Sequence, residues 1–339
     1  MIKEIPAVSV IVPLFNAEAY IGECLTSLAG QTLQDFEIIV VDDCSTDGSR
    51  AVVENFFAHF GDNLKLMMIS PNSGCAAIPR NFAMAEARGK YVYFLDADDL
   101  LTENALAELY EVAESSNADV VHPEKCITFF FEGGQICAES VSFQEGEFVM
   151  RPTLETFDFG ERMAGFVNKR YMWWACNKLF RRQFLRDNRI AFPALKKFED
   201  FIFVIKCLLS ARNYVRVPFV SYCYRLREDS LSHQSQDAVS FSQDAIKLFR
   251  VLDEFIRGEQ FFRDNPQYRY RLLDFFMQEQ LKTIADAFFG KGNSEPAAVF
   301  ECFNERFFSA NPEDNAALTA YLFVAANVLK NRLEVRDNP

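Results

Sequence analysis

The strongest constraint on the fold is a repeating pattern in the first hundred residues, where short apolar runs alternate with segments of helical periodicity. Val8–Val12, Phe36–Val41, Leu64–Ile69 and Tyr91–Leu95 each have the length and apolar character of a buried strand. The segments between them place apolar residues three and four positions apart, as amphipathic helices do. Strands that alternate with helices form a parallel sheet covered by helices. The sequence therefore predicts an α/β fold.

The rest of the chain shows weaker patterns. Thr102 is the predicted cap of the helix after the fourth strand. Between Val120 and Arg170 the periodicity degrades, and Gly133 with Gly134 predicts a hairpin turn in an irregular, strand-bearing region beside a pocket. The segments expected next are an extended Trp173–Phe180, helices at Arg181–Asn188 and Asp200–Ala211, and two strands in Tyr214–Tyr224 separated at Pro218.

Two domains are expected from this organisation. An α/β domain would cover residues 1–236, with halves of about 1–118 and 119–236, and a helical module would cover residues 237–339. The helical module is expected to pack on the first domain; basic clusters beside apolar residues also allow contact with an anionic membrane surface or self-association.

Composition and charge exclude several classes of protein. The net charge is −13, so the chain as a whole repels a phosphate backbone, and nucleic acid is not an expected partner. The nine cysteines form no Cys-x-x-Cys pair, which argues against a structural zinc site or a disulfide framework. No apolar run approaches about 18 residues, and no signal-peptide pattern starts the chain. A cytoplasmic protein, either free or at the inner face of the cell membrane, is predicted.

Polar residues follow each predicted strand of the first half. In an open α/β sheet, ligands bind beyond the carboxyl ends of the strands. Asp96 and Asp98 come directly after the fourth strand, and paired carboxylates at such a position suit a hard divalent cation, Mg²⁺ or Mn²⁺. The other loops at this edge are Pro13–Glu18, Asp42–Gly48 and Pro71–Asn81.

A second acidic pair, Glu199 and Asp200, precedes an apolar helix. Such a pair either caps the helix through the macrodipole or supplies a general base. A polar, basic segment follows that helix and its strand, and it either contacts a diphosphate or is a solvated loop. This segment contains Arg225, Arg227, Ser230, Ser232 and His233.

Five segments, taken together and in order, resemble the family-two inverting glycosyltransferases, which have the GT-A fold and include many enzymes of bacterial cell-surface polysaccharides. They span most of residues 8–233, and the C-terminal helices are not covered. The resemblance implies that residues 1–236 form a GT-A catalytic domain with a Rossmann-like mixed sheet, a nucleotide-binding first half and an acceptor-binding second half. The segments are Val8–Asn16, Gln31–Gly48, Asn72–Asn81, Gly89–Asp99 and the Phe-Glu-Asp of residues 198–200.

The resemblance also implies a role for individual residues at the donor side. Pro13 and Phe15 would flank the base, Asp43 would hydrogen-bond the base edge, and Asp98 would ligate the Mn²⁺ or Mg²⁺ that bridges the two phosphates. The full set of implied nucleotide contacts is Pro13, Phe15, Asn16, Glu18, Asp43, Arg80, Asn81, Asp96 and Ala97. The implied diphosphate contacts are Arg227, Ser230 and His233.

At the acceptor side, Asp200 is the implied general base and Glu199 would orient the acceptor or the sugar. Trp174, Asn177 and Lys178 would shape the acceptor site. The Pro-Arg-Asn version of the third motif is similar to enzymes that glycosylate teichoic-acid-type polymers. Position 15 is Phe where Tyr is frequent in the family, which keeps stacking and removes a hydroxyl group.

The predicted function is transfer of a sugar from a nucleotide diphosphate, UDP being favoured, to a hydroxyl group of a glycan, lipid-linked or polymer acceptor with inversion. The product would be a surface polysaccharide, a lipooligosaccharide or a wall polymer. Two alternatives remain open. One is an inactive nucleotide-sugar-binding or scaffold protein with the same fold. The other is a nucleotidyltransferase, which needs a glycine-rich basic loop after the first strand, where this chain has PLFNAEAY.

Overall fold

The computed structural model describes residues 5–132, 135–141, 148–227, 238–269, 271–273 and 275–276. The chain divides into two compact units, residues 1–230 and residues 231–339. In the second unit, helices α9 (Ala238–Gly258) and α10 (Gln260–Asp264) are described, and most of the other helices predicted there lie outside the described residues. No helix within the described ranges is long and apolar enough to cross a membrane.

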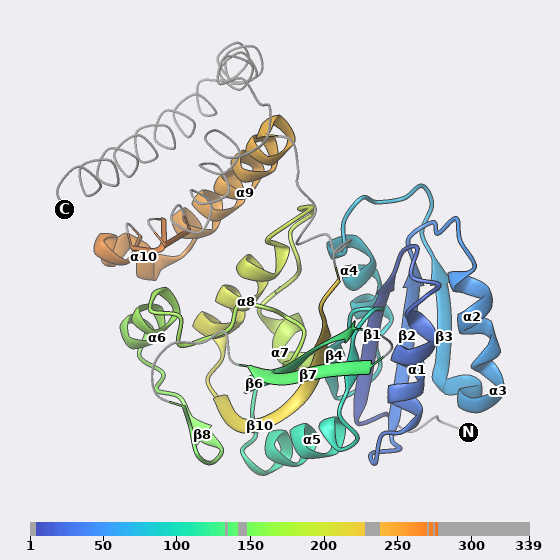
Figure 1. Ribbon diagram of the computed structural model, residues 1–339. Helices are drawn as coiled ribbons and strands as arrows, with labels where there is room; N and C mark the ends of the chain where they lie inside the picture. The colour runs from blue at the N-terminus through green and yellow to red at the C-terminus, as the bar shows by residue number, and fades with distance from the viewer. Residues whose placement is uncertain are drawn as a thin grey trace. The chain divides into compact units, whose positions relative to one another are not determined.

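A ten-stranded mixed sheet forms the frame of the first unit (Figure 1). Its strands are β1 (Val8–Leu14), β2 (Phe36–Asp42), β3 (Leu64–Met68), β4 (Tyr91–Phe94), β5 (Leu100–Leu101), β6 (Val120–Glu132), β7 (Gln135–Val141), β8 (Thr153–Leu154), β9 (Leu179–Arg181) and β10 (Tyr214–Arg225). The order across the sheet is β3-β2-β1-β4-β9-β6-β10-β5, with β7 beside β6 and β8 beside β10. Strands β1 to β4 are parallel, and β9 runs antiparallel to both neighbours. The α/β mixed sheet predicted from the sequence is confirmed.

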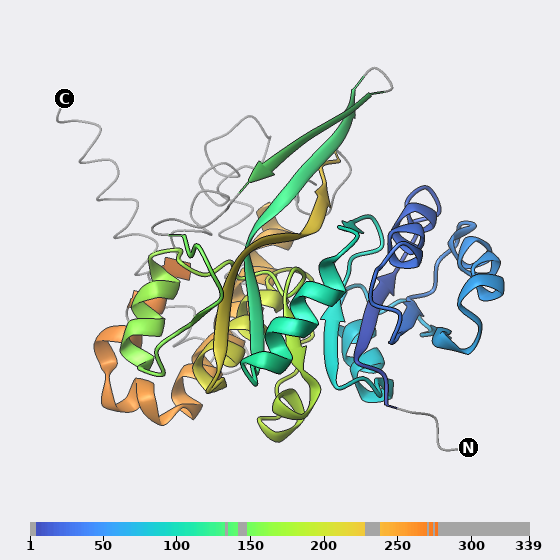
Figure 2. The same cartoon turned by 90° about the horizontal axis from the view of Figure 1, so that it is seen from below.

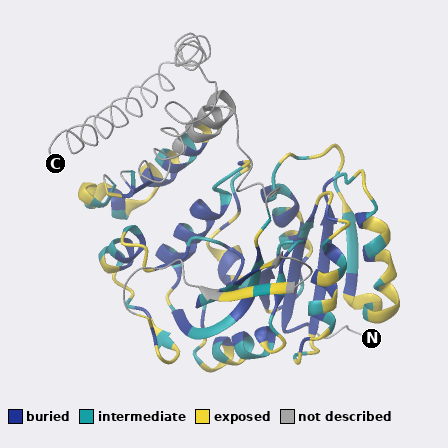
Figure 3. Ribbon diagram, viewed as in Figure 1, coloured by how far each residue is buried: buried dark blue, intermediate teal, exposed yellow. Residues whose placement is uncertain are grey.

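Helices cover both faces of this sheet. They are α1 (Ile21–Ala29), α2 (Ser49–Asn55), α3 (Phe57–Phe60), α4 (Ala77–Glu86), α5 (Ala105–Ser115), α6 (Phe159–Val167), α7 (Arg182–Asp187) and α8 (Glu199–Ser210), with a short 3₁₀ turn at Gly61–Asn63. Val8, Val10 and Val12 of β1 share a buried cluster with the apolar faces of α1 and α5. Figure 3 shows the central strands buried along their length and the outer faces of α2 and α3 exposed. Burial on both faces explains the nearly continuous apolar runs of β1 and β2.

The opposite face of the sheet is built from aromatic rings. Phe94 of β4 lies edge-on to Phe192 and to Phe203 of α8, with ring centroids 5.0 and 5.6 Å apart. Phe192 and Phe203 stack at 3.9 Å. This cluster attaches the start of α8 to the strand that ends just before Asp96, which brings the two acidic pairs found in the sequence to one edge of the sheet.

The second half of the sheet differs in part from the prediction. Tyr214–Arg225 is one long strand and not a pair separated at Pro218. Its pairing with β6 shifts register between Val217 and Val220 and again before Cys223. A bulge of this kind accommodates a proline, which cannot donate a ladder hydrogen bond, without ending the strand.

The ends of two other segments were also predicted wrongly. Helix α5 begins at Ala105 with no side-chain cap, and the Thr102 hydroxyl donates instead to the Val220 carbonyl at 3.1 Å. Within Trp173–Phe180 only the last two residues belong to a strand, β9. Tertiary contacts with β10 and α8 hold both segments, and a local pattern does not record such contacts.

Strands β6 and β7 form an antiparallel ribbon, and Figure 2 shows its outer end extending beyond the other strands. Glu132 pairs with Gln135 at that end. The glycine pair predicted to form the turn lies between them, outside the described residues. The inner part of β6 pairs with β10, which brings Phe129 opposite Arg225 near the edge where the predicted site lies.

Candidate active site

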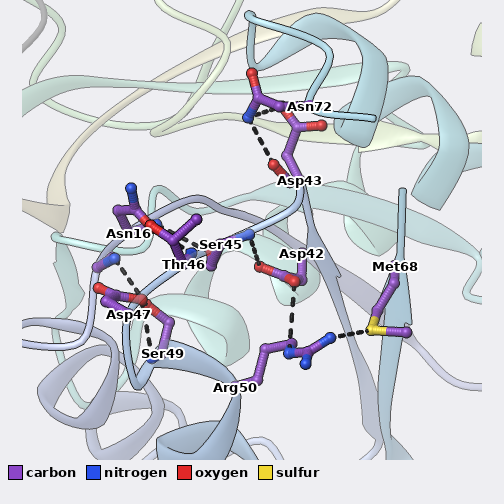
Figure 4. A network of polar contacts seen from close by, with 11 residues as sticks. Asn16, Asp42, Asp43, Ser45, Thr46, Asp47, Ser49, Arg50, Met68 and Asn72 are labelled. Atoms are coloured by element: carbon purple, nitrogen blue, oxygen red, sulfur yellow. Dashed lines mark hydrogen bonds and ion pairs between the residues drawn. The ribbon is translucent and has the colours of Figure 1, made fainter. Parts of the chain in front are cut away.

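The loops that follow β1 and β2 are tied to each other by hydrogen bonds (Figure 4). The Asn16 amide oxygen accepts from the Thr46 backbone nitrogen at 2.8 Å, and the Asn16 backbone nitrogen donates to the Ser45 hydroxyl at 3.0 Å. Glu18 accepts from the Gly48 nitrogen at 2.9 Å. Asn16 has a φ of 45°, a left-handed conformation that asparagine adopts more readily than most residues. These bonds hold the two loops as one surface, and a direct donor contact by Asn16 or Glu18 stays a prediction.

The surface contains an exposed aromatic ring beside a buried carboxylate. Phe15 is 51% exposed, and Pro13 beside it is half-buried. Asp43 is buried, and its carboxylate accepts from the Ser73 nitrogen at 2.8 Å and the Ser73 hydroxyl at 2.7 Å. Asn72 donates to the Asp43 carbonyl at 2.6 Å, so the third loop is tied to the second (Figure 4). The arrangement offers a flat ring and a fixed acceptor group, which are the elements needed to bind a base.

A single arginine joins the two acidic pairs. Arg80, on α4, is 3% exposed and donates from Nη2 to Asp96 at 2.7 Å. Its Nη1 donates to Glu199 at 3.0 Å and to Asp200 at 2.9 Å, although Asp200 is 120 positions away in the sequence. The second oxygen of Asp200 accepts from the Ala175 nitrogen at 3.0 Å. Arg80 was predicted to hold the nucleotide, and in the structure both of its terminal nitrogens bind carboxylates of the site.

Burial dominates the ionisation of the acidic pair. It raises the pKa of Glu199 to about 7, with a further contribution from the charge of Asp200 and opposition from Arg80. Burial also raises the pKa of Asp200, again against the effect of Arg80. A carboxylate whose pKa lies closer to neutrality is a stronger base than an exposed one, and such shifts are typical of groups that transfer protons.

A second arginine pairs with the other carboxylate of the Asp-Ala-Asp motif. Arg227 contacts Asp98 at 2.9 Å, and its guanidinium lies 4.6 Å from the centre of the Tyr20 ring. Arg225 donates from Nε to the Asp98 carbonyl at 2.8 Å and from its backbone nitrogen to Asp99 at 2.8 Å. Sequence reasoning missed Tyr20, because an aromatic residue at a helix start usually has only a packing role. The end of β10 is thus fixed to the end of β4.

The carboxylates at this edge fit a hard cation in chemistry and in charge. Burial raises the pKa of Asp98, and the nearby Asp96 carboxylate raises it further. A divalent cation would relieve this repulsion, and carboxylate oxygens are ligands that Mg²⁺ and Mn²⁺ accept. No group of three or more metal-binding side chains exists among the described residues, so phosphate oxygens and water would complete the coordination.

The residues predicted to shape the acceptor site separate into two groups. Trp174 is partly exposed and precedes Ala175, whose nitrogen donates to Asp200. Trp174 therefore lies close to Asp200. Asn177 and Lys178 are fully buried. Burial lowers the pKa of Lys178 to about 8. Both side chains are bonded to neighbouring parts of the fold, and a direct acceptor contact by either stays a prediction.

Hydrogen bonds explain the burial of Asn177. Its amide donates to the Pro123 and Lys125 carbonyls at 3.4 and 3.3 Å, and its oxygen accepts from the Ser221 hydroxyl at 2.8 Å. The Lys178 ammonium donates to the Trp174 carbonyl at 2.5 Å. These bonds join β6, β10 and the loop before β9.

Four predicted contacts remain. Asn81 uses both ends of its amide on the backbone of Phe192, at 2.8 and 3.0 Å, and its contact with the nucleotide stays a prediction. Ala97 is buried between the two aspartates of its motif. Ser230 and His233 lie outside the described residues.

Replacement of Asn177 tests its structural role. In Asn177→Ala we expect the free energy of unfolding to fall by about 1–3 kcal/mol, because buried polar partners lose their hydrogen bonds. We expect the affinity for a donor nucleotide to be unchanged. Urea unfolding followed by tryptophan fluorescence measures the first quantity, and Asn55→Ala, at an exposed position, is the control. A variant of normal stability with weakened acceptor binding would support the predicted acceptor contact.

Comparison with known proteins identifies the family of the chain. The family described as Glycosyl transferase family 2 matches residues 9–188, a segment that holds the loops, Arg80 and the Asp-Ala-Asp motif. Glycosyltransferase GlyG of Streptococcus pneumoniae is 29% identical over 250 residues, which cover 71% of this chain and 78% of GlyG.

Poly(ribitol-phosphate) β-N-acetylglucosaminyltransferase TarS of Staphylococcus aureus is 32% identical over 248 residues, which cover 72% of this chain. The matched part is only 39% of TarS, so the chain spans much less than the whole of that relative.

Solved structures share the fold. The structure of S. aureus TarS residues 1–349 in complex with UDP-GlcNAc superposes with a TM-score of 0.62 and 24% identity, covering 94% of this chain and 81% of that one. A mannosyltransferase from Pyrobaculum calidifontis, in complex with GDP-Man and Mn²⁺, superposes with a TM-score of 0.53 and 19% identity, covering 96% and 87%. With the family match over more than half of its length, the chain belongs to glycosyl transferase family 2 and is a glycosyltransferase of the GT-A fold.

Proposed function

We propose that the protein transfers a sugar from a UDP-linked donor to a hydroxyl group of a surface polymer, in an inverting reaction that depends on Mn²⁺ or Mg²⁺. The observation that carries the proposal is that one guanidinium, that of Arg80, lies within 3.0 Å of both Asp96 and Asp200. A carboxylate at the donor end of the sheet and a buried carboxylate suited to accept a proton therefore meet at one point. Inverting transfer requires such a pair of groups.

The reaction we propose is a single in-line displacement. The acceptor hydroxyl gives its proton to Asp200 while its oxygen forms a bond to the anomeric carbon. The bond between that carbon and the β-phosphate oxygen breaks, and UDP leaves with the electron pair. Glu199 orients the acceptor or the sugar, and no covalent sugar-enzyme intermediate forms.

Charge on the leaving diphosphate must be neutralised for this displacement. A metal ion held by Asp98 and Asp96 would supply that neutralisation as a Lewis acid. Arg227 already contacts Asp98 at 2.9 Å and is the cationic side chain that we assign to the diphosphate. Ser230 and His233 remain further proposed contacts.

The named relatives indicate the class of donor and acceptor. TarS and the enzyme TarP, both of S. aureus, are named poly(ribitol-phosphate) β-N-acetylglucosaminyltransferases, and a Bacillus spizizenii relative is named a poly(ribitol-phosphate) β-glucosyltransferase. UDP-GlcNAc and UDP-glucose are therefore the first donors to test, and a polyol-phosphate polymer is the first acceptor. Other glycan or lipid-linked acceptors also offer a hydroxyl group and remain proposed acceptors.

The proposed setting follows from the substrates. Donor binding belongs to the half of about 1–118, acceptor binding to about 119–236, and the boundary with the helical module is placed at residue 237. We place the reaction in the cytoplasm or at the inner face of the cell membrane. The C-terminal helices are the proposed surface for membrane contact or self-association.

Release of UDP tests the proposed function. The full chain is incubated with UDP-GlcNAc, UDP-glucose or GDP-mannose, with and without Mn²⁺, in the presence of poly(ribitol phosphate). We expect UDP release from one UDP-sugar that requires both the metal and the polymer. Binding of a nucleotide sugar without release or transfer under any of these conditions would support the inactive scaffold instead.

The role of Phe15 can be tested separately. Since stacking of a base on an aromatic ring contributes about 1–3 kcal/mol, we expect Phe15→Ala to weaken UDP binding by about tenfold or more. Calorimetry measures the affinity, and Phe82→Ala, at another exposed phenylalanine, is the control. An unchanged affinity would remove Phe15 from the base site.

A further inference from the structure

The guanidinium of Arg80 is buried and faces the carboxylates at the edge of the sheet. Arg80 is 3% exposed, and its two terminal nitrogens bind Asp96, Glu199 and Asp200. Its Nε has no hydrogen-bond partner among the described residues. The Arg80 side chain is thus committed to the carboxylates of the site, and it leaves little surface for contact with a base or a ribose.

An aromatic cluster supports this guanidinium from behind. Its carbon lies 5.3 Å from the centre of the Phe192 ring. The Phe192 backbone is held at both its nitrogen and its oxygen by Asn81, the next residue after Arg80 on α4. The ring stacks on Phe203 of α8 at 3.9 Å, and Phe94 of β4 packs on both. Helix α4, strand β4 and helix α8 therefore meet at Arg80, and none of them moves without affecting it.

The start of α8 is held in an unusual backbone conformation. Phe198, directly before Glu199, has a φ of 65°, which is costly for a bulky residue and persists only where the surroundings enforce it. Its ring packs on Trp173 at 6.0 Å. Asp200 is fixed at one oxygen by Arg80 and at the other by the Ala175 nitrogen. The orientation of the Asp200 carboxylate is therefore set by two hydrogen-bond donors, the Arg80 side chain and the Ala175 backbone nitrogen.

We propose that Arg80 is a positioning residue that couples occupancy of the donor site at Asp96 to the orientation of the base Asp200. Three carboxylates share the Arg80 guanidinium. When Asp96 engages the donor, its hold on Arg80 weakens, and Arg80 is left to the pair at the start of α8. Arg80 then holds Asp200 more firmly when a donor engages Asp96 than when it does not. This inference rests on the proposed function, because it assumes that Asp200 is the base.

Two substitutions separate this role from nucleotide contact. In Arg80→Met we expect kcat to fall about 100-fold, since a small misplacement of a catalytic group costs about that much. We expect the dissociation constant for UDP to stay within about threefold of the wild-type value. Arg80→Lys keeps the charge and loses the planar guanidinium, so its kcat should be about tenfold higher than that of Arg80→Met. Arg186→Lys, at an exposed position on α7, is the matched control.

The pH profile of kcat is a readout that loss of packing alone would not move. The groups that face Asp200 are Arg80 from α4, Asp96 after β4, Glu199 in the same helix, and Lys178 and Cys176 in the loop before β9. Removal of the Arg80 charge disfavours the ionised acids. The acid limb of the profile should therefore move to higher pH in Arg80→Met and remain near its wild-type position in Arg80→Lys.

The outcomes separate this inference from the proposed function. If the wild-type protein releases no UDP from any donor, the proposed function fails and this inference fails with it. If the wild type is active and Arg80→Lys raises the dissociation constant for UDP more than tenfold with kcat unchanged, Arg80 is a nucleotide contact and the inference alone is wrong. Arg80→Lys keeps the test valid if Arg80→Met does not fold.

Discussion

Asp200→Asn is expected to fold and to bind the donor nucleotide, and to lose transfer of the sugar. Asparagine has nearly the same shape, but its single amide oxygen replaces two carboxylate oxygens, so it keeps one of the two hydrogen bonds that Asp200 accepts from Arg80 and the Ala175 nitrogen at 2.9 and 3.0 Å. It cannot take a proton from a hydroxyl group at neutral pH. A positioned general base contributes about 10²–10⁴-fold to a rate, so we expect kcat to fall by that factor.

The measurement compares UDP release by wild type and variant at saturating donor and acceptor. Calorimetry with UDP shows whether the donor site is intact, and Asp187→Asn, at the exposed end of α7, is the control for loss of a carboxylate elsewhere. Near-normal turnover in Asp200→Asn would rule out the base assignment, because an amide cannot accept the proton.

The ionisation of Asp200 also predicts how the wild-type rate depends on pH. Burial raises the pKa of Asp200 and raises the pKa of Glu199 to about 7. The base must be ionised to accept a proton, so the rate should begin to fall at a pH above the range in which an exposed aspartate titrates. An unpaired, exposed aspartate would keep its activity down to about pH 4. A rate that stays constant from pH 8 to pH 5 would contradict the buried base.

The first half of the fold was predictable because its signals are local. Strands β1 and β2 are buried on both faces, so each is a continuous apolar run of the length of one strand. The helices between them show a single apolar face, and polar residues begin where each strand ends. These rules place Asp43, Asp96 and Asp98 at the ligand edge with no knowledge of the contacts between them.

The contacts within the site were not predictable in the same way. Which carboxylates meet Arg80 depends on how α8 packs on β4, and the rings of Phe94, Phe192 and Phe203 decide this across more than 100 positions of sequence. The family resemblance therefore assigned Arg80 to the nucleotide from its place in a motif. A polar residue inside a recognised motif reads as functional, but its position there does not show whether its side chain faces solvent.

The long strand β10 illustrates the same limit. Pro218 is a local signal for a break, and the local prediction was two strands. Pairing with β6 along most of its length provides enough hydrogen bonds for the strand to continue through a bulge. The acceptor half of the protein depends on such long-range pairing more than the donor half does, and it was predicted less well for that reason.

Asp98→Ala is expected to lose the metal-dependent part of donor binding. Asp98 is the carboxylate we assign to the cation. Burial and the charge of Asp96 raise its pKa because they disfavour its ionised form, and a divalent cation beside it would relieve that repulsion. Loss of groups that only support metal ligands costs about 10–100-fold in affinity, so loss of a ligand itself should cost about 100-fold or more. We expect Mn²⁺ to strengthen UDP binding in wild type and to have no such effect in the variant.

Calorimetric titration of UDP with Mn²⁺ or with EDTA, on wild type, Asp98→Ala and the control Asp187→Ala, makes this comparison. In EDTA, wild type and Asp98→Ala should bind UDP with affinities within a few-fold of each other, since the proposed binding surface for the uracil base, around Phe15 and Asp43, is intact in both. Mn²⁺-dependent affinity that is unchanged in Asp98→Ala would move the metal to other residues. If wild type binds no nucleotide with or without metal, the geometry of the loops serves the fold alone, and the scaffold interpretation becomes the better one.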